Sequence, residues 1–226
     1  MDNKNVEIQS NDDSSKMAKN IQKLMEWSYD KSLNGLPQMD SAEELANNYL
    51  SKHKNSEDAI KALIKTQNMK AATSGFLTGL GGVIALPVAI PASVGSLLYV
   101  QTRMVAAIAH IRGYNLKDDQ VKTLVFVSLT GNAAADVLRN VGIDISKKIT
   151  MSYIKRKLSG EVLKKINRLV GFRLLTKTGS TGVINLTKAV PLLGGIVGGT
   201  FDASSTYVVG KVAKKQLFNQ SPTFTV

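Results

Sequence analysis

The chain has few of the residues that enzymes most often use at their reactive centres. Its 226 residues include no cysteine and only two histidines, His53 and His110, which lie far apart in the sequence. The lack of cysteine excludes a disulfide framework and thiol chemistry, and two separated histidines give a zinc site little to build on. No serine elbow and no metal-ligand spacing is present. We therefore expect no metal and no cofactor, and these absences argue against an enzyme without deciding the question.

Targeting signals are missing as well. Residues 1–16 are polar and acidic, without the charged and then apolar start of a signal peptide. The sequence has no Met-Gly start for myristoylation and no C-terminal cysteine for prenylation, so no lipid anchor is indicated. We expect a protein in the cytoplasm, or facing it. Its composition predicts a disordered polar tail at 1–16, a helical domain over 17–218 and a flexible tail at 219–226.

Charge is absent from one long stretch, because no charged side chain occurs between Lys70 and Arg103. Pro87 and Pro91 divide this stretch into a short helix over 75–86 and a second helix that runs to Arg112. The first helix is ~18 Å long, too short to cross ~30 Å of hydrocarbon, and the second carries Arg103 near its middle. Three alternatives stay open: a buried core, a monotopic or re-entrant insertion, and a spanning hairpin.

Glycines recur in this stretch and again in a similar apolar segment at 190–213. Such glycines allow another helix to approach closely, and a phosphate-binding loop would need a preceding strand and a following lysine, which are absent. We interpret both segments as glycine-faced helices packed together at the centre of the protein. The expected helix-packing glycines are Gly75, Gly79, Gly82, Gly194, Gly195, Gly198 and Gly199.

The rest of the chain favours helices over strands. Aromatic residues make up only 6% and β-branched residues do not alternate. Gly35 and Pro37 predict the end of a first helix, Ser41 and Glu44 form a capping box, and Asn55 or Ser56 caps the helix after it. We therefore predict an all-α fold, with one domain of many helices and the two apolar segments at its centre.

Positive charge is concentrated in residues 147–177, where ten lysines and arginines accompany a single acidic residue, Glu161. Apolar residues recur at helical spacing through the same stretch, as they do in cationic amphipathic helices at membrane interfaces. One alternative is a solvated outer face of the domain. Another is a nucleic-acid-binding surface, although this stretch lacks the aromatic residues that would stack on bases and any known nucleic-acid-binding motif. The expected phosphate-binding or membrane-binding residues are Lys147, Lys148, Lys155, Arg156, Lys157, Lys164, Lys165 and Arg168.

A few polar residues interrupt the apolar helices, among them Gln101 and Thr206. Residues of this kind usually form a buried, hydrogen-bonded network, and Asp202 is a candidate partner for Arg103 inside the core. The alternative is a ligand or catalytic pocket in which His110 works with an aspartate as acid and base. That alternative would use Arg103, His110, Asp136 and Asp202.

Four stretches together resemble the EcsC family of bacterial proteins. They are LMEWSYDKSLNGLPQMDSAEELANNYL, SGFLTGLGGVIALPVAIPASVGSLLYVQTRMVAAIAHIRGYNL, LTGNAAADVL and VPLLGGIVGGTFDASSTYVVGKVAKK. The resemblance covers most of residues 24–215 and implies a bacterial, mostly helical protein that is cytosolic or membrane-associated. It implies no catalytic residues. A role beside an ABC exporter is implied only by the gene context of the family's namesake.

The leading hypothesis is a non-enzymatic peripheral membrane protein at the inner face of the bacterial membrane. Its basic helices would hold an acidic membrane surface, and a membrane transporter or another protein is a further candidate partner. Nucleic acid is disfavoured, and nothing in the sequence indicates the oligomeric state. The alternative is a helical enzyme, hydrolytic or binding a small molecule, that uses the Arg, His and Asp residues named above.

Overall fold

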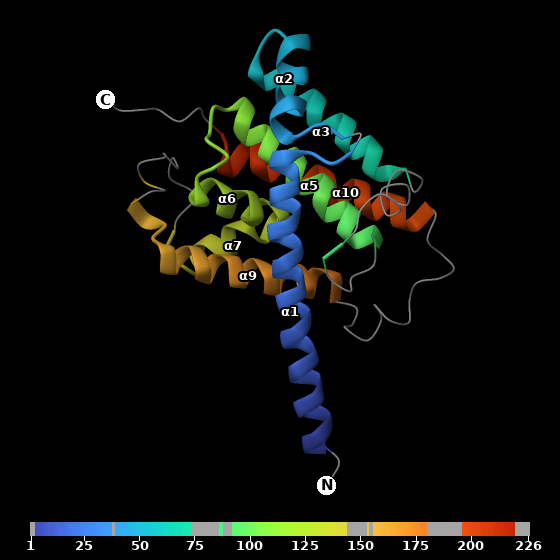
Figure 1. The fold of residues 1–226 in the computed structure, drawn as a ribbon, viewed down its shortest axis with the longest axis vertical. Coiled ribbons are helices and arrows are strands. Elements are labelled where there is room, and N and C mark those ends of the chain that lie inside the picture. Colours follow the sequence, from blue (N-terminus) through green and yellow to red (C-terminus); the bar gives the residue numbers. More distant parts are fainter. Residues whose placement is uncertain are drawn as a thin grey trace.

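The computed structural model describes residues 3–37, 39–73, 86–87, 92–143, 153, 156–179 and 196–219, with side chains except at 3–15, 176–179 and 196–203. Throughout these residues the regular elements are helices, so the predicted all-α fold is confirmed (Figure 1). They are α1 (Asn3–Asn34), α2 (Ala42–Lys52), α3 (Ser56–Ala72), α5 (Ala92–Ile111), α6 (Asp119–Leu129), α7 (Ala134–Arg139), α9 (Gly160–Gly179) and α10 (Ile196–Val212). A 3₁₀ turn at Gly131–Ala133 precedes α7, and a π-helical turn at Ala213–Leu217 follows α10.

Short side-chain signals set the helix boundaries where the sequence predicts them. Ser41 and Glu44 form both hydrogen bonds of the capping box at the start of α2. The Asn55 side chain accepts a hydrogen bond from the Asp58 backbone at the start of α3. α1 ends directly before Gly35, whose φ of 77° suits glycine. These local signals account for the tight turns between the first three helices.

α5 lies at the centre of the fold. α1, α2, α3, α6 and α10 all pack against it, and its residues from Leu98 to Ala109 are all buried. Among the described helices it alone has the length and composition to cross a membrane, yet 83% of that apolar stretch is buried by protein. For α5, the structure therefore agrees with the buried-core alternative. The shorter helix expected over 75–86 lies almost entirely outside the described residues.

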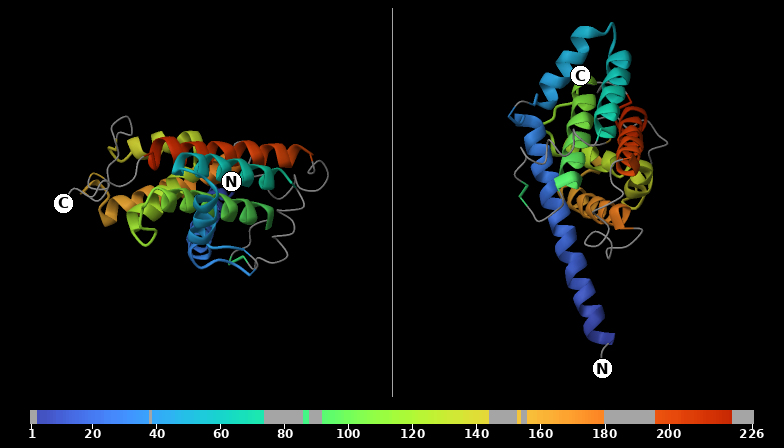
Figure 2. Two further views of the ribbon diagram at one scale, coloured as in Figure 1. Left: turned by 90° about the horizontal axis from the view of Figure 1, so that it is seen from above. Right: turned by 90° about the vertical axis from the view of Figure 1, so that its right-hand side faces the viewer.

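α3 and α10 run side by side in opposite directions (Figure 2). Glu57 at the start of α3 pairs with Lys214, just beyond α10. A Cβ atom added at Gly210 of α10 would lie 2.9 Å from Cγ1 of Ile64 on α3. Close glycine packing therefore occurs at Gly210, a position that the sequence pattern did not single out.

Most of the glycines expected to pack helices cannot be compared with the structure. Gly198 and Gly199 lie in α10, in a part whose side-chain surroundings are not described. The others, Gly75, Gly79, Gly82, Gly194 and Gly195, lie outside the described residues. The central packing of the two apolar segments is seen in their described parts, where α5 contacts α10.

α1 begins within the segment 1–16, for which the composition predicts a disordered tail. The helix starts at Asn3, and its first half extends away from the other helices, past α9 (Figures 1 and 2). Among the residues of α1 whose side chains are described, from Lys16 onwards, the first buried one is Ile21. Once the packed part is helical, each further residue adds one backbone hydrogen bond without a new nucleation cost. A polar composition is therefore compatible with a helical backbone in this segment. Of the tail predicted at 219–226, only Asn219 is described.

Candidate functional site

The outer face of α9 carries the basic surface that the sequence predicts. α9 packs against α1, α6 and α7, and Ile166 and Val170 are fully buried on its inner face. Its opposite face exposes Lys164, Lys165 and Arg168. The amphipathic pattern of the sequence therefore corresponds to one buried face and one exposed, cationic face.

Two more cations precede this helix. Arg156 and Lys157 are both exposed directly before α9 begins. Together with those of α9 they make five of the eight expected cations, all exposed. The other three, Lys147, Lys148 and Lys155, lie outside the described residues. We call these five residues the basic face: Arg156, Lys157, Lys164, Lys165 and Arg168.

Among the described side chains, one acidic residue pairs with the basic face. Glu161 accepts a hydrogen bond from Lys164 at 3.1 Å, in an exposed i,i+3 pair of small expected stability. Within the described residues, the other four cations have no ion-pair partner. Uncompensated cations on one exposed surface favour an anionic partner.

Arg103 is buried, with only 3% of its surface exposed. Its Nη1 donates a hydrogen bond to the backbone oxygen of Asp40 at 3.0 Å, and its guanidinium carbon lies 5.7 Å from the centre of the Tyr99 ring. Burial lowers the pKa of the Arg103 guanidinium from its usual value. Arg103 therefore faces the connection between α1 and α2.

The orientation of Arg103 does not favour the expected pairing with Asp202, which lies on α10. Gln101, two residues earlier on α5, donates hydrogen bonds to Ser205 at 3.2 Å and to Thr206 at 3.1 Å, both on α10. Two residues correspond to about 200° around a helix, so Arg103 points away from the side that contacts α10. The side chain of Asp202 itself is not described. The buried network that the sequence suggests forms at Gln101 and Thr206.

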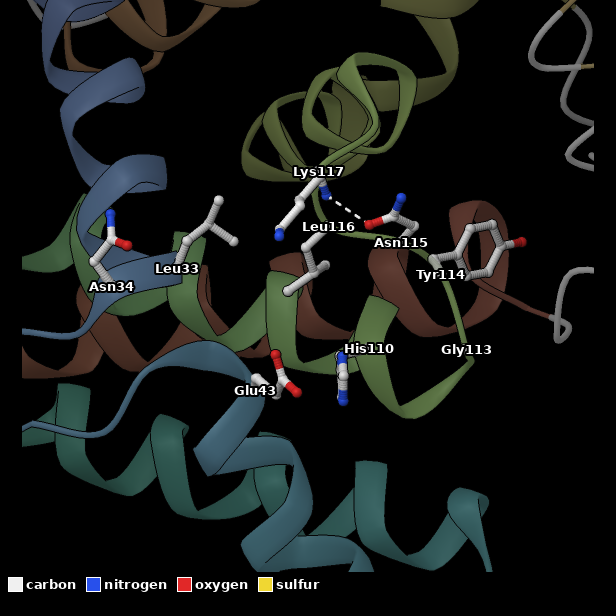
Figure 3. A pocket seen from close by; sticks show the side chains of 9 residues that line it. All are labelled: Leu33, Asn34, Glu43, His110, Gly113, Tyr114, Asn115, Leu116 and Lys117. Atoms are coloured by element: carbon white, nitrogen blue, oxygen red, sulfur yellow. Dashed lines mark hydrogen bonds between the residues drawn. The ribbon is translucent and has the colours of Figure 1, made fainter.

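His110 lies at the end of α5 and lines a pocket of about 490 Å³. Figure 3 shows Glu43 from α2 beside the ring of His110, with Lys117 from the loop after α5 on the far side of the opening. The full lining is Leu33, Asn34, Glu43, His110, Gly113, Tyr114, Asn115, Leu116 and Lys117. These groups can form hydrogen bonds with a small polar molecule.

The residues of the enzymatic alternative do not meet in this pocket. Arg103 precedes His110 by seven residues, which is about 10 Å along the helix axis, and it is not among the lining residues. Asp136 is exposed on α7 and pairs with Arg139 at 3.0 Å. The described side chains therefore do not form a shared acid–base site. No group of three potential metal ligands occurs in the described part of the chain.

A charged cluster that the sequence analysis missed joins three elements at another place. Glu57 of α3 pairs with Arg112 after α5 and, at 2.7 Å, with Lys214 after α10. Hydrogen bonds from these two cations, Lys214 first, lower the pKa of Glu57 to about 2. Arg112 also donates a hydrogen bond to the backbone oxygen of Phe218 at 3.1 Å. Only the isolated position of Arg112 at the end of an apolar run hinted at this cluster.

The observations define an all-α protein with a buried apolar helix at its centre and a cationic amphipathic helix on its surface. The chain belongs to the EcsC protein family, whose family model matches residues 3–217. This range includes every described helix, so the resemblance seen in the sequence is confirmed. No match was found among curated proteins or among solved structures.

Proposed function

We propose that this EcsC-family chain is a non-enzymatic protein that attaches to acidic membrane surfaces through the basic face. The observation that carries the proposal is the exposure of Arg156, Lys157, Lys164, Lys165 and Arg168 on or directly before one amphipathic helix. Each cation near an anionic leaflet contributes on the order of 1 kcal/mol to binding. Five such groups are enough for reversible electrostatic attachment.

The proposed attachment is peripheral and needs no change in the core. α5, the described helix with the composition of a membrane span, is covered by five other helices. A lipid surface would therefore meet α9 while the packing around α5 is kept. The proposed location is the inner face of the bacterial membrane, where a transporter such as an ABC exporter is a second proposed partner.

The first test removes charge without changing shape. A variant with Lys157, Lys164, Lys165 and Arg168 replaced by Gln is compared with the wild type for binding to vesicles that contain ~30% anionic lipid. We expect the variant to bind on the order of a thousandfold more weakly, because four cations that each contribute about 1 kcal/mol are lost. Circular dichroism verifies that both proteins fold, as expected for changes at exposed positions.

The matched control removes the same number of charges elsewhere. The four exposed lysines Lys52, Lys54, Lys65 and Lys215 belong to other helices or their ends. Of these helices, α2 lies well away from α9 (Figure 1). This control should keep most of its binding. Equal losses in the two variants would mean that only net charge matters, and unchanged binding in the α9 variant would refute the role of the basic face.

A further inference from the structure

Phe172 on α9 is exposed to 57%, the largest exposed fraction among the large hydrophobic side chains described. Single exposed hydrophobic residues are common on protein surfaces and need no explanation by themselves. Phe172 differs because of its neighbours: Lys165 and Arg168 precede it by seven and four residues. Residues at these spacings share one side of a helix.

The rotation of α9 is fixed by its inner face. A Cβ atom added at Gly171 would lie 3.1 Å from Cγ of Gln22, where α9 crosses α1. Ile166 and Val170 are fully buried on the same inner side. Because α9 cannot turn without losing these contacts, the Phe172 ring stays on the outer side together with Arg168.

We infer that Phe172 is the hydrophobic part of a phospholipid-binding site whose polar part is Lys165 and Arg168. This inference rests on the proposed function and adds a second kind of contact to it. The two cations would bind lipid phosphates at the level of the headgroups. The ring would enter the boundary between headgroups and acyl chains, where aromatic side chains of interfacial helices are found.

A bilayer fits this arrangement better than a nucleic acid. Proteins that bind single strands present several aromatic rings to successive bases, whereas Phe172 is the sole aromatic residue in α9. Lys165 and Arg168 lie on the same side of the helix as the ring, as expected for a helix lying flat on a charged lipid surface. An oligonucleotide is therefore the competing ligand in the test.

The experiment measures binding of full-length Phe172→Ala and Phe172→Trp variants to vesicles with ~30% phosphatidylglycerol. The Ala variant should bind roughly tenfold more weakly, since partial burial of one aromatic ring is lost, and the Trp variant should bind as well as the wild type or better. Leu50→Ala is the control, because Leu50 is 37% exposed on α2, a helix that lies away from α9 in Figure 1. Its binding should not change.

Two further readouts separate insertion from attraction by charge. The salt dependence of binding should be the same for Phe172→Ala as for the wild type, because no charge is removed. Since the chain has no cysteine, Phe172→Cys gives a unique site for a polarity-sensitive dye. The dye should report an apolar environment when vesicles are added, whereas a dye at Leu50→Cys should not.

The outcomes distinguish this inference from the proposal on which it rests. If the wild type binds the vesicles and Phe172→Ala binds equally well, the inference is wrong and electrostatic attachment stands. If the wild type binds no vesicles, both are wrong. Tighter binding of the wild type to a single-stranded oligonucleotide, weakened by Phe172→Ala, would also overturn the inference and assign the ring to base stacking.

Discussion

Arg112, directly after α5, donates a hydrogen bond from its guanidinium to the carboxylate of Glu57 in the first turn of α3. Only 7% of Arg112 is exposed, so removal of the carboxylate would leave a buried charge without its ionic partner. Lys214 binds the other carboxylate oxygen at 2.7 Å. Glu57 thus connects α3, the end of α5 and the π-helical turn after α10.

Glu57→Gln should destabilise the fold. We expect the free energy of unfolding to fall by about 1–3 kcal/mol, because the buried cation Arg112 loses its charged hydrogen-bond partner. The loss is not larger because Glu57 itself is half-exposed. Urea denaturation followed by circular dichroism gives the free energy of unfolding. Glu43→Gln is the control, since Glu43 is exposed and has no ion pair within the described residues. Equal effects of the two substitutions would contradict the role given to Glu57.

The contribution of Glu57 should depend on pH. Its pKa is about 2 in the folded protein, below its ordinary value of 4.5. Between these values the unfolded chain binds more protons, so stability falls as the pH is lowered. The difference in unfolding free energy between wild type and Glu57→Gln should be constant above pH ~5 and should shrink towards pH ~2. Other carboxylates are common to both proteins and cancel in the comparison. A difference independent of pH would show that the pair does not form.

The contact between α3 and α10 can be tested at Gly210. Gly210→Ala should lower the free energy of unfolding by about 1–2 kcal/mol, because its Cβ would lie 2.9 and 3.0 Å from the two γ-carbons of Ile64. This loss is expected although alanine favours helices more than glycine does. In an Ile64→Ala background the same change should be neutral or stabilising. Urea denaturation of the wild type, the two single variants and the double variant gives the four free energies of unfolding that this double-mutant cycle needs. An identical cost in both backgrounds would exclude this contact as the cause.

Deletion of residues 1–16 should leave the core intact. The first half of α1 extends away from the other helices (Figure 1), and from Lys16 onwards the first buried residue is Ile21. We therefore expect the free energy of unfolding to change by less than about 0.5 kcal/mol. Leu24→Ala, at a fully buried position of α1, should cost about 2–5 kcal/mol. A large loss of stability on deletion would show that the first half of α1 makes contacts important for the fold.

The same deletion should strengthen binding to acidic vesicles. Residues 1–16 contain four acidic and two basic residues, and the first half of α1 extends past α9 (Figure 1). Removing this segment takes away net negative charge from a part of the chain that runs past α9, so less of the protein is repelled by an anionic surface. Vesicle sedimentation at low salt would measure the change, and weaker binding after deletion would contradict it.

The sequence predicts the local features of this fold well, because they depend on neighbouring residues. The capping box at Ser41 and the helix end before Gly35 are examples. The polar contact between α5 and α10 was also suggested, since Gln101 and Thr206 interrupt apolar helices. The exposed cations of α9 follow from its periodicity.

Other contacts between distant elements were not predicted. Glu57 looked like an ordinary acidic residue in a first helical turn, and nothing in its surroundings indicates Arg112 or Lys214. Arg103 was given Asp202 as a candidate partner, whereas the fold turns it towards the backbone of Asp40. Phe172 could not be told from a core residue until the rotation of α9 was known.

The most direct test of the central claim is flotation of the purified full-length protein with neutral and with acidic vesicles, at low and at high salt. The account predicts binding to acidic vesicles at low salt, with most of it lost at ~0.5 M salt because ions screen the basic face. No binding to acidic vesicles, or equal binding to neutral and acidic vesicles, would contradict attachment through the basic face.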